Sequence, residues 1–88
     1  MTSYKISNKY KTPEGYTVAK KYKTYPESAR ETYPLTRMIP GDSFFVPNFT
    51  ARDLRGVIHS RSRTRGMKFV SETVNTNKQF GARVWRIK

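Results

Sequence analysis

Cysteine is absent from this sequence of 88 residues, and acidic residues are few. Without cysteine there are no disulfide bonds, no thiolate zinc sites and no cysteine nucleophile. No apolar run reaches the length of about 18 residues that a membrane-spanning helix needs. Residues 1–5 lack the apolar segment of a secretory signal peptide. These absences predict a cytoplasmic protein that does not enter a membrane.

The scarcity of acids leaves a large excess of positive charge. The chain has 18 Lys and Arg residues against 6 Asp and Glu, so its formal net charge is +12. Such an excess repels itself in a compact chain, and a polyanion would relieve that repulsion while releasing condensed counterions. We therefore expect DNA or RNA as the partner. An acidic protein surface and a merely solubilising charge are the alternatives, and a membrane surface is disfavoured because no long amphipathic helix has a broad apolar face.

The acidic residues and the single histidine give little support for an enzyme. No two acids have an obvious metal-binding spacing, and a nuclease would need clustered carboxylates or a histidine with partners to hold metal and water. His59 has neither a second metal ligand nor an orienting group nearby in the sequence. Gly41 and Gly66 are isolated turn residues and form no phosphate-cradling loop. The sequence predicts a non-enzymatic binding protein without metal or cofactor.

The composition changes near Tyr33, which divides the chain into residues 1–32 and residues 33–88. The first part is rich in Lys and Tyr and poor in aliphatic residues. One interpretation is a hairpin, with short strands near residues 4–6 and 15–21 around a turn at residues 13–15. Another is a basic arm that orders only on its partner.

Lysines and tyrosines alternate through this first part, and the tyrosines have two interpretations. They could stack on unpaired bases while the lysines neutralise the backbone, or they could cover a sparse core with their hydroxyls in water. The lysines that we expect to add non-specific affinity are Lys20, Lys21 and Lys23.

Residues 33–88 have the pattern of a compact α+β domain. A turn at residues 39–42 precedes an apolar strand at residues 43–46, which Pro47 ends. Two further segments, at residues 67–74 and 82–87, are rich in β-branched and aromatic residues and flank a polar loop. The order strand, helix, hairpin predicts an antiparallel sheet of three to five strands with one basic helix packed on it. Its expected aromatic core is Phe44, Phe45, Phe69 and Trp85.

The helix is predicted to run from Thr50 to Arg63 or Arg65. Thr50 can cap its first turn, Asp53 stands where a capping-box acid would reach back, and Gly66 suits a left-handed position after the last turn. Its apolar face is expected to pack on the sheet and consists of Ala51, Leu54, Val57 and Ile58.

Five arginines give this helix an unusual positive charge. Arg52, Arg55, His59 and Arg63 form a stripe about 80° wide beside the apolar face. Arginine offers a planar fork that holds phosphate through two hydrogen bonds, and such contacts position a nucleic acid without reading its sequence. A solvated helix face explains one or two of the arginines but hardly all five. We therefore predict that the helix grips phosphates through Arg52, Arg55, His59, Arg61, Arg63 and Arg65.

Basic residues outside the helix are expected to extend this patch. They are Lys68, Lys78 on the hairpin loop, Arg83 and Arg86. In the last strand Arg83 and Trp85 alternate with Val84 and Arg86, so both faces are mixed and the pattern leaves open which face is buried.

Two blocks of the second part are similar to a family of short tailed-bacteriophage proteins. The first block is Tyr33-Pro34, Met38 and the run from Gly41 to Pro47; the second is Gly66, Lys68, Phe69 and the run from Arg83 to Ile87. The resemblance implies action in the cytoplasm of an infected bacterium and no particular activity. It keeps an alternative function open, in which the basic surface binds a host protein complex such as RNA polymerase or a defence complex. A homodimer through an open sheet edge is a further expectation.

Overall fold

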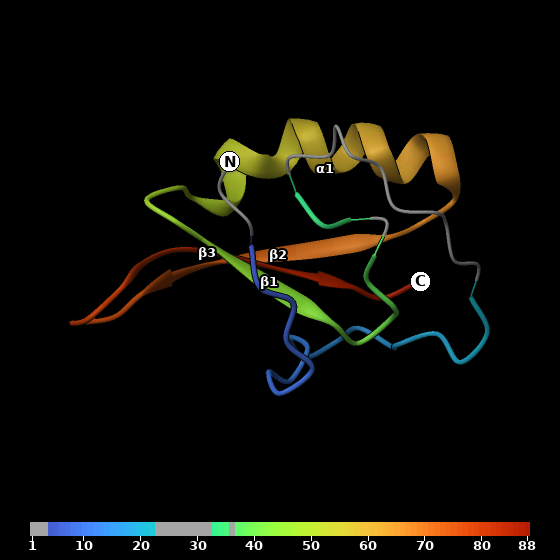
Figure 1. Ribbon diagram of the computed structural model, residues 1–88, viewed down its shortest axis with the longest axis horizontal. Helices are drawn as coiled ribbons and strands as arrows, with labels where there is room; N and C mark the ends of the chain where they lie inside the picture. Colours follow the sequence, from blue (N-terminus) through green and yellow to red (C-terminus); the bar gives the residue numbers. More distant parts are fainter. Residues whose placement is uncertain (1–3, 23–32, 36) are drawn as a thin grey trace.

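The computed structural model describes residues 4–22, 33–35 and 37–88, without the side chains of residues 57 and 60–65. Four elements follow one another: β1 (Ser43–Pro47), α1 (Ala51–Arg65), β2 (Phe69–Asn75) and β3 (Phe80–Arg86). The strands form one antiparallel sheet in the order β1-β3-β2, and α1 lies along one face of it (Figure 1). The predicted α+β class and the order strand, helix, hairpin are confirmed.

Both ends of α1 carry the predicted capping residues. Thr50 Oγ1 accepts a hydrogen bond from the Asp53 N–H at 3.2 Å, and Asp53 Oδ2 accepts one from the Thr50 N–H at 2.9 Å. Gly66 follows the helix with φ of 68°, in the left-handed region that glycine adopts without a steric penalty. The helix is therefore defined by local chemistry at each end.

The hairpin between β2 and β3 is tighter than predicted. Asn75 pairs with Phe80, so the loop contains residues 76–79 only. Inside it the Thr76 N–H donates to the Gln79 carbonyl at 2.8 Å, and Thr76 Oγ1 accepts from the Gln79 N–H at 3.1 Å. These two bonds close the turn early, and Phe80 consequently begins β3 and is not part of the loop.

The main core lies between α1 and the sheet. Leu54 and Ile58 of α1 pack on Phe44 and Val84, which settles that the face of β3 carrying Val84 is turned toward the helix. Phe44 and Trp85 are buried as predicted, whereas Phe45 and Phe69 are half-buried. The buried cluster consists of Leu35, Met38, Phe44, Val46, Leu54, Ile58, Ala82 and Val84.

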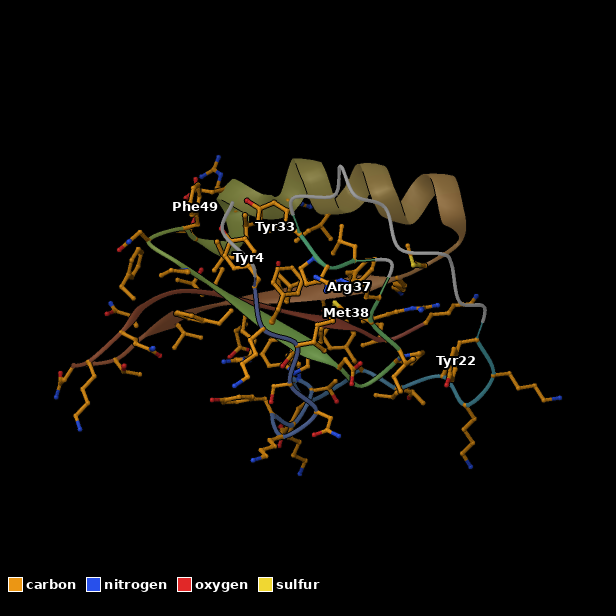
Figure 2. The ribbon with its side chains drawn as sticks, viewed as in Figure 1. Tyr4, Tyr22, Tyr33, Arg37, Met38 and Phe49 are labelled. Carbon is orange, nitrogen blue, oxygen red and sulfur yellow. The ribbon has the colours of Figure 1, made fainter. Side chains whose placement is uncertain are left out.

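Aromatic rings from the start of the chain extend this core. The rings of Tyr4 and Tyr33 lie 5.3 Å apart between centroids, and they lie 6.1 and 5.8 Å from the ring of Phe44. Figure 2 shows Tyr4 and Tyr33 side by side near the start of α1. The interpretation that tyrosines cover a sparse core therefore holds for Tyr4.

Residues 4–22 lie mainly on the side of the sheet away from α1 (Figure 1). Ser7 forms an isolated antiparallel bridge with Ser43, and the indole N–H of Trp85 donates to the Tyr10 carbonyl at 3.2 Å. The Ala19 N–H donates to the Ile87 carbonyl at 2.8 Å. The expected turn is present at Gly15, with φ of 91°, but neither expected strand forms in these residues. This described stretch packs on the sheet as an irregular segment.

Candidate nucleic-acid interface

An open groove of about 930 Å³ runs between α1 and β2. From α1 it is lined by Arg52, Arg55 and His59, and at the start of β2 by Lys68. Tyr16 reaches it from the N-terminal segment. Its full lining is Tyr16, Ala51, Arg52, Arg55, Ile58, His59, Lys68, Phe69, Val70 and Ser71, and no acidic side chain is among these residues. This groove unites four of the predicted site residues.

Helical periodicity places the cations at the groove. Leu54 and Ile58 are 2% and 6% exposed, so their side of α1 is fixed against the sheet. Residues one position away on a helix are turned by about 100°, which brings Arg55 and His59 to the border of that buried side. Both side chains are exposed, as is Arg52 one turn earlier. Because the buried face is fixed against the sheet, Arg52, Arg55 and His59 lie beside β2.

The N-terminus of α1 is tied to the sheet at one end of the groove. The Ala51 N–H donates to Thr73 Oγ1 on β2 at 3.0 Å. This bond satisfies one of the free N–H groups of the first helical turn and fixes the distance between the two walls.

The floor of the groove borders the outer edge of β2. Within the part of the chain that the structure describes, β2 pairs with β3 on one side and with no strand on the other. An edge strand turns every second N–H and C=O outward, so backbone donors lie beside the basic side chains. These backbone donors, together with the positive charges of Arg52, Arg55 and Lys68, suit an anionic chain.

Arg83 lies on the face of the sheet away from α1, and its guanidinium already contacts neighbouring side chains. Its Nη1 donates to Ser43 Oγ at 3.0 Å, and its guanidinium carbon lies 3.4 Å from the ring centroid of Tyr10 and 5.6 Å from that of Phe45. Burial lowers the pKa of Arg83, and the neighbouring Tyr10 partly offsets this. This side chain acts as a clamp that holds the N-terminal segment to the sheet.

Arg86 is buried and does not belong to the basic surface that the sequence predicted. Arg86 is 1% exposed, and it donates from Nη1 to the Met38 carbonyl at 2.7 Å and from Nε to the Lys88 carbonyl at 3.1 Å. Its guanidinium also lies 5.7 Å from the ring centroid of Tyr22. A side chain that is buried in this way cannot reach a phosphate, so the expectation that Arg86 extends the patch is corrected.

The remaining predicted residues are dispersed or outside the described part. Lys20, Lys21 and Lys78 are exposed but do not line the groove. Lys23 lies outside the described residues, and so do the side chains of Arg61, Arg63 and Arg65. Whether these residues contact a nucleic acid stays a prediction.

A second groove of about 820 Å³ lies near β1 on the other side of the sheet. It also contains cations, Lys5, Lys9 and Arg83, but Asp42 lines it too and Arg83 is held by its neighbours. Its free positive charge is therefore smaller than that of the groove beside β2.

The sequence did not predict that Tyr16 lines the groove, nor that two phenylalanines are exposed. Tyr16 was one of several similar tyrosines, and only the fold distinguishes it. Phe49 and Phe80 are each 43% exposed, although large apolar residues are usually buried. The pattern Pro47-Asn48-Phe49 was a usable signal, because a ring between a strand stop and a helix cap has no regular element to bury it.

Comparisons with protein-family models, with curated proteins and with solved structures give no match to this chain. The resemblance to phage proteins thus stays a prediction. In the described residues no group of three or more His, Asp or Glu side chains could hold a metal ion. No described helix is long and apolar enough to cross a membrane.

Proposed function

We propose that this protein is a non-enzymatic nucleic-acid-binding protein of the phage-infected bacterial cytoplasm. The observation that carries the proposal is the groove between α1 and β2, where Arg52, Arg55, His59 and Lys68 meet and no acid lines the wall. The net charge of +12 supplies the long-range attraction that brings a polyanion to it.

The chemistry of the groove suits a phosphate backbone more than a base sequence. Arg52 and Arg55 are exposed and lie three positions apart on α1, so neighbouring phosphates can each receive a bidentate fork. Contacts of this type fix the position of a nucleic acid without specifying its sequence. We therefore propose largely sequence-independent binding, which the outer N–H groups of β2 would assist.

The proposal is tested by measuring affinity for labelled single- and double-stranded DNA and RNA over a series of salt concentrations. The double variant R52A/R55A removes two charges from the groove. Each lost phosphate contact lowers the log–log salt slope by about 0.9 on duplex DNA, so the double variant should lower it by about 1.8. If the two proteins bind equally at the 1 M reference, the double variant should bind about 60-fold more weakly than wild type at 0.1 M.

The double variant K5A/K9A is the matched control. It removes the same number of charges from exposed lysines of the second groove. The control should bind nearly as wild type does once salt screens distant charges. Equal losses in both variants would mean that net charge alone attracts the ligand, and the assignment of the groove would then be wrong.

A second candidate function is binding to a host protein complex, such as RNA polymerase or a defence complex. The open edge of β2 favours it, because an edge strand can accept an extended peptide and the basic wall beside it would select an acidic one. This function predicts a stoichiometric partner that stays bound in nuclease-treated bacterial lysate, together with DNA binding that vanishes by about 0.15 M salt.

A further inference from the structure

Two exposed phenylalanines lie near the start of α1, and neither is among the residues that line the groove. The Asn48 N–H donates to the Phe80 carbonyl at 2.9 Å, which joins the start of β3 to the residue before Phe49. Phe49 directly precedes the cap residue Thr50, and Figure 2 shows its ring directed away from the molecule beside the first turn of α1. Two segments that are distant in sequence thus place Phe49 and Phe80 near the start of α1, where Arg52 lines the groove.

The exposure of Phe80 follows from where the helix begins. Alternation along β3 places Phe80 on the same face as Ala82 and Val84, which is the face that α1 covers. The bond from Ala51 to Thr73 places the first turn of α1 over the row in which Thr73 pairs with Ala82. Phe80 lies two residue pairs further along the ladder, opposite Asn75, and the helix does not extend that far. Its ring is therefore presented on an uncovered part of the sheet.

Neither ring stacks on another aromatic ring in the part of the chain that the structure describes. The aromatic pairs among the described residues join Tyr4, Tyr33 and Phe44, and neither Phe49 nor Phe80 belongs to one. Burial of apolar surface is favourable, so two rings left 43% exposed forgo part of the stabilisation that a flat apolar ligand could supply.

Cations flank the two rings. Arg52 stands three positions after Phe49 at the near end of the groove, and the exposed Lys78 precedes Phe80 by two positions in the hairpin turn. An aromatic ring beside cations that follow a groove is the usual arrangement for single-stranded nucleic acid, since every base has a face that can stack. The same positive charge disfavours a second copy of this chain as the occupant.

We propose that Phe49 and Phe80 stack on unpaired bases of a single-stranded nucleic acid whose backbone lies in the groove. This inference rests on the proposed function and adds the class of ligand. Bases inside a duplex already stack on one another, so their faces are not available to the rings. Single strands are therefore the preferred ligand.

The experiment uses three probes: an oligothymidylate, an abasic oligonucleotide of the same length, and a duplex. The abasic probe keeps the phosphates and lacks the bases. Wild type should bind the oligothymidylate more tightly than the abasic probe. The variant F49A/F80A should lose about tenfold affinity for each missing ring on the oligothymidylate and nothing on the abasic probe. F49Y/F80Y keeps both rings and should restore binding, and circular dichroism checks that each variant is folded.

The outcomes distinguish a failure of the stacking inference from a failure of the proposed nucleic-acid binding. If wild type binds the oligothymidylate and the abasic probe equally, the groove holds phosphates and the stacking inference is overturned. Binding to none of the three probes would overturn the proposed function as well. If wild type dimerises and F49A/F80A becomes monomeric without losing affinity for the oligothymidylate, the rings form an interface between copies and the inference is likewise wrong.

Discussion

Replacing Gly81 by alanine should weaken the sheet at its central strand. Gly81 is buried on β3 and pairs with Pro47 of β1 and Val74 of β2. A Cβ atom at this position would lie 2.5 Å from Phe45 Cζ and 2.9 Å from Phe45 Cε2, and it would also collide with the backbone carbonyl oxygen of Val46. The Phe45 ring could turn, but the carbonyl belongs to β1 and moves only if the strand moves.

The magnitude follows from two opposing effects. Overpacking a well-packed site costs about 1–3 kcal/mol, and the contact with backbone places this case near the upper end. Alanine also lowers the conformational entropy of the unfolded chain, which raises the free energy of unfolding by about 0.4–1 kcal/mol. We expect G81A to lower the free energy of unfolding by about 2 kcal/mol, out of about 4–13 kcal/mol for a chain of this length.

Gly56 is the matched control, because the same substitution there should have the opposite sign. Gly56 is exposed within α1, and a Cβ atom would meet nothing within 4 Å. Alanine is favoured over glycine in a helix by about 0.5–1 kcal/mol, so G56A should stabilise the protein by that amount.

Urea denaturation followed by circular dichroism measures both variants. With a slope of about 1 kcal/mol per molar urea, the midpoint of G81A should fall by about 2 M while that of G56A rises by up to about 1 M. The two slopes should be equal, which shows that only stability has changed. A midpoint for G81A at or above that of wild type would refute the close approach of β1 to β3.

Two further predictions concern charged groups. The hydrogen bonds to Thr50 hold the pKa of Asp53 below 3.8, so its stabilisation is present above that pH and is lost as the pH falls through the lower folded-state pKa. In melting experiments between about pH 2 and pH 6, D53N should therefore lose less stability on acidification than wild type does; an unchanged acid profile would contradict this cause. R86M removes the donors to the Met38 and Lys88 carbonyls and should lower the unfolding free energy by about 1.5–3 kcal/mol. Its salt slope for DNA should equal that of wild type, and a smaller slope would show that Arg86 does contact phosphates.

The sequence predicted those parts of the fold that local chemistry determines. Thr50, Asp53 and Gly66 define α1 through contacts within a few residues, and the alternation in β3 predicted two faces correctly. The choice between those faces was not predictable, because each carries both apolar and basic residues. The face that carries Val84 packs on Leu54 and Ile58, and Arg86 on the same face is accommodated because it donates to the carbonyl of Met38, which is distant in the sequence.

The candidate site was predictable in part for the same reason. Arg52, Arg55 and His59 share one helix, so their common stripe followed from periodicity, and Lys68 was expected to extend it. Tyr16 joins them only because the N-terminal segment is fixed to the sheet by bonds such as that from Trp85 to the Tyr10 carbonyl. Contacts between residues so distant in sequence leave no periodic signal.

The strand order has a consequence for biosynthesis. β1 and β2 do not pair with each other, and each is held in the sheet by β3, the last of the four elements to be translated. While the ribosome adds residues up to the start of β3, β1 and β2 lack the strand that joins them in the described sheet, and α1 has no complete sheet on which to bury Leu54 and Ile58. A nascent chain that stalls before β3 emerges therefore exposes apolar strands to chaperones and proteases, and the domain folds as a unit once that strand is free.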